Sequence, residues 1–288
     1  MLFCMQLIWS IELKIKEFLD NKDVNSFIKW IGSYLDNEDS LKYGDKDIDE
    51  SWRFNSIYNA YKKYYWNNKY FKANQKDLDK YNKELNNALS CKEDDDEVKK
   101  VCNRILEWGK VTARNKKFIE KSKYLTQELL NIKAIIDPNT FEINKNRLIK
   151  IKTNSGFIKI YSVLNNNIII YDSRVSSAIC FFIREFCSEM DHKPIPDVLK
   201  FGLARERKED TDRRNLNNDV YKFTKTKYDD DYLNNAIKAS WLLKGILEKT
   251  DSNFNTEVQE NERLRALESA FFMIGYDLTN ISIRKISK

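Results

Sequence analysis

The 288-residue chain is poor in the residues that interrupt helices. It contains only seven glycines and three prolines, whereas sheet-rich folds with many tight turns use both residues often. Hydrophobic residues recur at helical spacing along most of the chain, and few breakers interrupt them. The sequence therefore predicts an all-α protein, with more than half of its residues in α-helix and at most a few short strands.

Metal ligands are scarce as well. The single histidine, His192, lies in a loop just before Pro194, and the five cysteines include no Cys-x-x-Cys pair. A zinc site needs about four ligands at suitable spacing, so we expect no structural metal and no cofactor. The odd number of cysteines indicates free thiols in a reducing compartment.

Long apolar segments are missing too. The first 11 residues are apolar, but no basic region precedes them, no small-residue cleavage site follows, and Glu12, Lys14 and Lys16 soon interrupt them. No segment reaches the roughly 18 consecutive apolar residues that span a bilayer. We expect a cytoplasmic protein without a membrane partner.

Charge of one sign is in modest excess: 50 basic and 44 acidic residues give a net charge of +6. This balance permits a polyanionic partner without requiring one. The basic residues are densest between positions 145 and 159, a stretch without any acid. That density predicts a surface that faces phosphates, although a solvated face has the same pattern. The basic residues there are Lys145, Arg147, Lys150, Lys152 and Lys159.

A second group of arginines has a different setting. Arg205, Arg207, Arg213 and Arg214 alternate with acidic side chains. Such alternation is typical of an exposed, ion-paired loop rather than of a DNA-binding patch.

An acidic run at Lys92–Glu97 divides the chain. We place a boundary near residue 95, between an N-terminal helical region (1–95) and a helical core with C-terminal helices (96–288). In the first region, residues 10–36 read as helix interrupted near Asn21–Lys22, and residues 37–50 as a loop. In the second, a helix restarts after the acidic run and ends at Trp108–Gly109, and Thr112 or Asn115 is a candidate cap for the next helix.

Aromatic residues are concentrated between positions 52 and 71. Phe54, Tyr58, Tyr61 and Tyr65 fall on one face of a predicted helix, with several lysines between them. Aromatic rings among cations can stack unpaired bases. A helical stripe of rings more often packs into a core, and we favour that interpretation.

The segment from Asn154 to Phe186 carries the chemistry. Asn154–Gly156 predicts a turn, and residues 157–164 predict a short apolar helix with Lys159 and Ser162 on its polar side. The extended apolar run Ile168–Tyr171 follows, and Asp172 is then a candidate N-cap for the next helix.

A glycine-containing turn, a helix that bears a lysine, and a buried segment that delivers an aspartate to the next helix resemble the helix-hairpin-helix DNA glycosylases. The 8-oxoguanine glycosylase-like branch is the most similar, chiefly over residues 150–190. A group of bacterial proteins is similar over about residues 50–280. That second likeness is carried by Trp108–Thr112, Ile170–Val175, Ala239–Leu243 and Phe272–Leu278.

The resemblance implies a helix-hairpin-helix glycosylase-like fold of two helical lobes with a cleft. It also implies that the protein acts on the N-glycosidic bond of a damaged or modified base, flipped out of duplex DNA. Lys159 would be the nucleophile and Asp172 the electrostatic or general-base partner. The DNA-contacting residues would include Lys145, Arg147, Lys150, Lys152, Gly156 and Arg174, together with Lys110 and Arg114.

A non-enzymatic protein on the same scaffold remains the alternative. The hairpin of the glycosylases carries two glycines, whereas this turn has Gly156 alone. A scaffold that has lost part of its grip on phosphate would suit a nucleic-acid- or protein-binding module.

Overall fold

The computed structural model describes residues 15–43, 50–91, 95–136, 152–206, 210, 212–227, 229–279 and 281–284. Helical residues make up 63% of this part of the chain, and the strands in it are two or three residues long. The prediction of a mostly helical protein with few short strands is therefore confirmed.

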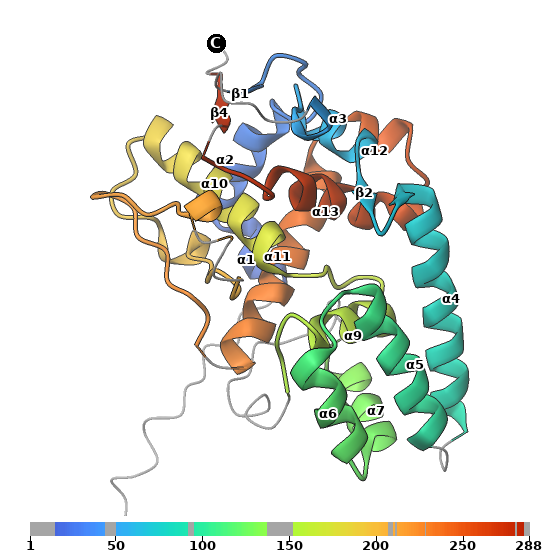
Figure 1. Cartoon of the computed structure of the whole chain (residues 1–288). Coiled ribbons are helices and arrows are strands. Elements are labelled where there is room, and N and C mark those ends of the chain that lie inside the picture. Colours follow the sequence, from blue (N-terminus) through green and yellow to red (C-terminus); the bar gives the residue numbers. More distant parts are fainter. Residues whose placement is uncertain are drawn as a thin grey trace, which may run out of the picture.

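The helices form two groups, and the long helix α4 (Phe71–Ser90) runs from one to the other (Figure 1). The larger group combines the two ends of the sequence, because α1 packs on α11, α2 on α10 and α11, and α3 on α13. Its members are α1 (Ile15–Asp20), α2 (Lys22–Gly32), α3 (Ile57–Lys62), α10 (Ser173–Glu189), α11 (Asp229–Lys249), α12 (Asn253–Thr256) and α13 (Arg263–Ile274).

The smaller group is built from the middle of the sequence. In it, α5 contacts α6, α7 and α9, and α4 contacts α5, α7 and α9. Its members are α5 (Asp95–Trp108), α6 (Ala113–Lys121), α7 (Leu125–Ile135) and α9 (Phe157–Leu164). Single 3-10 turns lie at Glu50–Trp52, Asp197–Leu199, Asp212–Arg214 and Glu260–Glu262. The division of the chain near residue 95 stays a prediction.

Several helix ends lie where the sequence places them. The Asn21 side chain accepts backbone N–H bonds from Asp23 and Val24, so it begins α2 and separates it from α1. Helix α5 ends at Trp108, before Gly109. Thr112 occupies the N-cap position of α6 but makes no side-chain cap bond, and Asn115 lies inside the helix and donates to the Val111 carbonyl.

The predicted loop at 37–50 contains a strand. β1 (Leu41–Tyr43) pairs antiparallel with β4 (Ile281–Ile283), with Leu41 opposite Ile283. A strand of three residues is too short to show a period of two in the sequence. Its partner lies near the other end of the chain, so no local hairpin signal indicates the pairing.

The aromatic segment is helical only in part. Phe54 and Tyr58 are buried, which confirms the core interpretation for them. The extension of the helical face to Tyr65 is wrong, because α3 ends at Lys62 and a hairpin of β2 (Tyr65–Trp66) and β3 (Lys69–Tyr70) follows. Asn67 and Asn68 have φ values of 51° and 60°, the left-handed pair that a two-residue hairpin turn requires.

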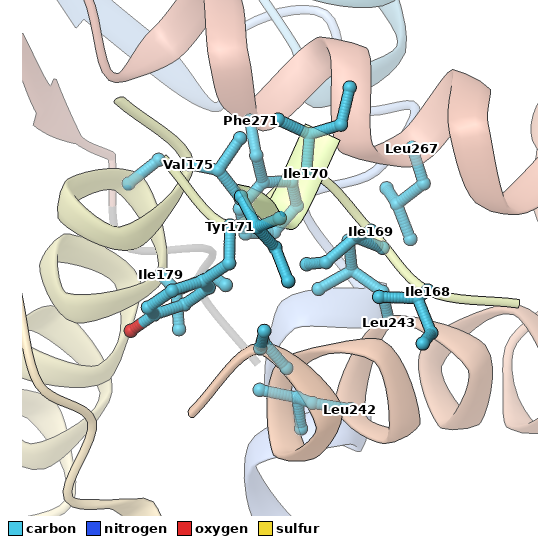
Figure 2. Packing of buried hydrophobic residues seen from close by; sticks show 14 of the residues in the cluster. Ile168, Ile169, Ile170, Tyr171, Val175, Ile179, Leu242, Leu243, Leu267 and Phe271 are labelled. Atoms are coloured by element: carbon cyan, nitrogen blue, oxygen red, sulfur yellow. The ribbon is translucent and has the colours of Figure 1, made fainter. Parts of the chain in front are cut away.

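The apolar run Ile168–Tyr171 is buried among α10, α11 and α13 (Figure 2). Its backbone groups form hydrogen bonds with side chains rather than with a neighbouring strand. The Ser240 hydroxyl accepts from Ile169 N–H, the Glu268 carboxylate accepts from Ile170 N–H, and Tyr232 donates its hydroxyl to the Tyr171 carbonyl. Buried backbone groups need partners, so these side chains fix the path of the chain up to Asp172.

Candidate active site

Lys159 lies in the first turn of α9 and is buried, with its side chain only 6% exposed. The polar side that the sequence assigns to Lys159 and Ser162 does not face solvent, because every residue of α9 is buried. The helix is covered by α4, α5 and α7. Burial lowers the pKa of the Lys159 amine below its ordinary value, although Asp172 and Glu268 nearby oppose the shift.

Gly109 makes room for this lysine. A Cβ atom at position 109 would lie 2.3 Å from the Lys159 Cδ and 2.8 Å from its Cε. The stem of the lysine therefore runs across the end of α5 at a point where a side chain would block it. The Lys159 Nζ donates to the Ser155 carbonyl at 3.0 Å, so both the stem and the amine are held.

Asp172 is the N-cap of α10, as predicted. Its Oδ1 accepts backbone N–H bonds from Arg174 at 3.0 Å and from Val175 at 3.2 Å. Its Oδ2 lies 3.7 Å from the Lys159 Nζ. The helix N-terminus and the amine both favour a negative charge at this position. One oxygen of the carboxylate thus anchors the side chain, and the other faces the lysine.

An ion pair on α13 fixes the segment between Lys159 and Asp172. Arg265 pairs with Glu268 and also donates to the carbonyls of Ser162 and Ile168, at 3.3 Å each. Glu268 in turn accepts the Ile170 N–H at 3.0 Å, and burial raises the pKa of this carboxyl. The chain therefore folds back after α9 along a path set by α13, which brings Asp172 to the lysine.

A pocket opens where these groups meet. Its walls come from four separate parts of the sequence: the hairpin with the start of α4, the end of α5, the Lys159–Asp172 segment, and α13. The cavity measures about 50 Å³, room for only a few water molecules at the roughly 10–15 Å³ that one water needs. Its aromatic lining residues are Tyr64, Trp66, Phe71, Trp108 and Phe272, and its polar ones include Asn74, Gln75, Lys159, Asp172, Arg265 and Glu268.

The hairpin is tied to the end of α5 beside this pocket. Trp66 and Asn67 both donate side-chain N–H bonds to the Trp108 carbonyl, at 3.1 and 2.7 Å. Lys110 follows with a φ of 54°, and its amine lies 4.8 Å from the centre of the Trp66 ring. Lys110 is exposed, and Trp66 lines the pocket, so the Lys110 ammonium group lies at the rim of the pocket.

Arg174 lies among aromatic rings next to Asp172. Its guanidinium is 4.4 Å from the centre of the Phe272 ring and 4.8 Å from that of Tyr276, with two tryptophan rings a little farther away. Gly275 lets α13 approach here, since a Cβ atom at that position would lie 2.0 Å from the Arg174 carbonyl oxygen. The motif Phe272–Leu278 therefore shapes the region around the start of α10.

The prediction of an exposed arginine loop is wrong for Arg214. Its side chain is 1% exposed and pairs with Asp210, and it donates to the Gly275 carbonyl and the Ser173 hydroxyl. It therefore joins the C-terminal end of α13 to the first turn of α10. Arg205 and Arg213 are exposed, and Arg207 lies outside the described residues.

A basic groove, distinct from the pocket, lies on the other side of the turn before α9. It measures about 490 Å³ and contains four cations from different parts of the chain. Arg114, Arg205 and Lys227 are exposed, and Lys152 is half-buried. Ser155 lines the groove while its carbonyl holds the Lys159 amine, so one residue connects groove and pocket.

The turn itself is held by asparagines. The Asn154 Oδ1 accepts N–H bonds from Gly156 and Phe157, and its amide donates to the Asn115 Oδ1 at 2.9 Å. Gly156 is buried under Asn115, whose amide nitrogen would lie 2.1 Å from a Cβ atom there. Gly156 thus allows the close contact between the turn and α6.

The structure brings together Lys159, Asp172 and Arg174, and it places Arg114 and Lys152 in the groove. Lys145, Arg147 and Lys150 lie outside the described residues. Sequence reasoning missed Gln75, Arg265 and Glu268, which lie in amphipathic helices without a local motif. Arg205 and Lys227 were missed as groove residues, because their proximity to α6 depends on the tertiary fold.

In the described parts of the chain, no helix is long and apolar enough to cross a membrane. The same parts hold no cluster of three or more histidine, cysteine, aspartate and glutamate side chains suited to a metal ion. No protein-family model, no curated protein and no solved structure matches this chain. The functional argument therefore depends on the geometry of the pocket and the groove.

Proposed function

We propose that the protein is a DNA glycosylase-like enzyme that breaks the N-glycosidic bond of a damaged or modified base. The observation that carries this proposal is the 3.7 Å approach of the Lys159 amine to the Asp172 carboxylate in an aromatic-lined pocket. An amine nucleophile and a fixed anion are the two groups that substitution at a sugar C1′ needs.

In the proposed reaction, the electron pair of the C1′–N bond leaves with the base, and the Lys159 lone pair forms a bond to C1′. One amine proton goes to the departing base. Opening of the C1′–O4′ bond then gives an imine, as the second amine proton passes to O4′. The burial that lowers the pKa of Lys159 favours the neutral amine that this step requires.

Asp172 stabilises the positive charge that develops on the sugar. Its Oδ1 is committed to two backbone amides, so its Oδ2 can serve the sugar without reorientation of the side chain. A preorganised anion of this kind is effective because it requires no rearrangement during the reaction.

Binding of a flipped base requires the pocket to widen, because about 50 Å³ is far below the roughly 300 Å³ or more of ligand pockets. Most of the lining residues belong to helices, whereas Trp66 lies on the short hairpin. We propose that the rings of the hairpin move outward as the base enters, and that the basic groove holds the phosphates of the same strand.

Borohydride trapping tests the proposed function. A duplex with a single abasic site, and a panel of duplexes with single base lesions, are incubated with the protein and sodium borohydride. Wild-type protein should form a covalent adduct, because the reagent reduces the imine to a stable amine. Lys159→Gln should form none, with nearly unchanged DNA affinity. Lys29→Gln, which removes one exposed charge on α2, is the matched control and should behave as wild type.

Two other outcomes would overturn the proposal. If the panel gives neither adduct nor base release while duplex DNA still binds, the protein is a nucleic-acid-binding module on this scaffold. If duplex DNA does not bind either, both nucleic-acid functions are excluded and a protein-binding role is the remaining interpretation.

A further inference from the structure

One side chain in the pocket wall has an unused hydrogen-bonding group. Gln75 lies on α4, one turn after Phe71 and nearly one turn before Leu78, and all three line the pocket. Gln75 is 8% exposed. Its side-chain oxygen, Oε1, is buried and finds no hydrogen-bond partner among the described residues.

The orientation of this amide is determined by its neighbour. The Gln75 Nε2 donates to the Asp79 Oδ1 at 2.8 Å. A carboxylate only accepts hydrogen bonds, so the group that faces Asp79 must be the amide nitrogen of Gln75. The amide oxygen therefore points away from Asp79. The unpartnered group is therefore an acceptor.

Neighbouring polar groups in the pocket are used by the fold. The Asn74 amide donates to the carbonyls of Trp66 and Lys69 and accepts from the Trp108 indole. The Ser269 hydroxyl donates to the Ala266 carbonyl. A buried polar group without a partner is costly, so the unpaired oxygen of Gln75, in the wall of the pocket, is available to a ligand.

We infer that Gln75 reads the bound base, and that the pocket selects a base with an N–H donor on its hydrogen-bonding edge. This inference rests on the proposed function for the identity of the ligand as a nucleobase. The aromatic walls bind the faces of a flat ring without regard to its edge groups. The acceptor supplies the selection: a base whose N–H is replaced by N–CH₃ leaves the oxygen unpaired and adds bulk beside it.

Matched pairs of duplexes test the inference. Each duplex carries one target nucleotide opposite a tetrahydrofuran abasic analogue, so that base pairing does not differ within a pair. One pair compares adenine with N6,N6-dimethyladenine, and the other compares uracil with 3-methyluracil. Dissociation constants are measured by fluorescence anisotropy with the full-length protein.

Wild-type protein should bind the donor member of at least one pair about tenfold more tightly. Gln75→Met keeps the length of the side chain and removes the acceptor, and it should reduce that ratio to about twofold or less. Gln127→Met is the control: Gln127 is exposed on α7 and makes the same type of bond, to Asn131 four residues on. It should keep the wild-type ratio.

The inference is overturned if wild-type protein discriminates within neither pair, or if Gln75→Met discriminates as wild type does. The dissociation constants of wild-type protein and Gln75→Met do not depend on the chemistry of Lys159. Failure of the Gln75 inference can therefore be told apart from failure of the proposed glycosylase activity. Discrimination without a borohydride adduct would support a base reader that is not an enzyme. An adduct without discrimination would leave the glycosylase and remove the role of Gln75.

Discussion

A lysine within an apolar helix has two opposite explanations: it reaches solvent, or it is buried for a purpose. The sequence around Lys159 indicates the helix and the turn before it, and it indicates Asp172 as a cap. It does not indicate burial, which arises because α4, α5 and α7 cover the helix and Gly109 leaves space for the stem. Charged side chains are seldom buried unless they are paired, and Lys159 is buried beside Asp172, so burial strengthens the case for the two residues together.

Burial of Lys159 has a consequence for stability. Because its pKa is lowered in the folded chain, the unfolded chain binds this proton more readily, and the free energy of unfolding rises as pH rises toward the ordinary pKa of 10.5. We expect wild-type protein to gain stability relative to Lys159→Met as the pH rises toward 10.5, by at most about 1.4 kcal/mol per pH unit. Urea denaturation at several pH values measures this difference.

Lys29→Met provides the comparison, since Lys29 is exposed on α2. Its stability relative to wild type should stay constant over the same pH range. If the Lys159→Met difference is equally flat, or if wild-type protein loses stability against it as pH rises, the lysine is not destabilised in its charged form and the basis for a neutral nucleophile is wrong.

Among the elements, the helix with Lys159 and the helix capped by Asp172 follow from periodicity and capping signals. The wrong predictions concern the short elements. The helical face that was expected to reach Tyr65 gives way to a hairpin, because the Asn67–Asn68 turn overrides the spacing of the rings. A two-residue turn of asparagines is a local signal for this outcome, and it was available in the sequence.

The contact between α5 and α9 yields a prediction for Gly109. In Gly109→Ala, the new methyl group would lie 2.3 Å from the Lys159 Cδ, so the lysine stem must move. Because nucleophilic attack depends on position, we expect borohydride adduct formation to slow by tenfold or more, in the order-of-magnitude range for a displaced nucleophile. DNA affinity should change little. Crowding at a packed contact also costs about 1–3 kcal/mol of folding stability.

Gly32→Ala separates the two effects. A methyl group at position 32 would lie 2.7 Å from the Thr250 Cγ2, a similar crowding against a side chain outside the pocket. It should lower the stability measured by urea denaturation without slowing the adduct. Equal rates in the two variants would mean that Gly109 has no specific role in placing the lysine.

For the whole molecule, composition and periodicity predict the helical class, but not the assembly of the site. The pocket joins residues as far apart in the sequence as Tyr64 and Phe272, and the groove joins Arg114 to Lys227. Such proximity depends on how α3 packs on α13 and how α4 bridges the two groups of helices. A single sequence carries no local record of these contacts, so the predicted DNA-contacting residues included Lys152 and Arg114 but not Arg205 and Lys227.

The groove leads to a prediction about salt dependence. If its cations contact phosphates, the logarithm of the DNA association constant should fall with the logarithm of salt concentration by about 0.9 for each contact. Charge reversal of Arg114, Lys152, Arg205 and Lys227 in one variant should weaken binding to duplexes of any sequence and flatten the slope. A loss of four contacts would change the slope by about 3.6.

Reversal of Lys29 and Lys42, which are exposed on α2 and β1, changes the net charge without touching the groove and should leave most of the slope intact. Anisotropy titrations at several salt concentrations measure both variants. If the two variants lose the same affinity and slope for each reversed charge, net charge alone explains the binding. The groove would then have no special part in guiding DNA to Lys159.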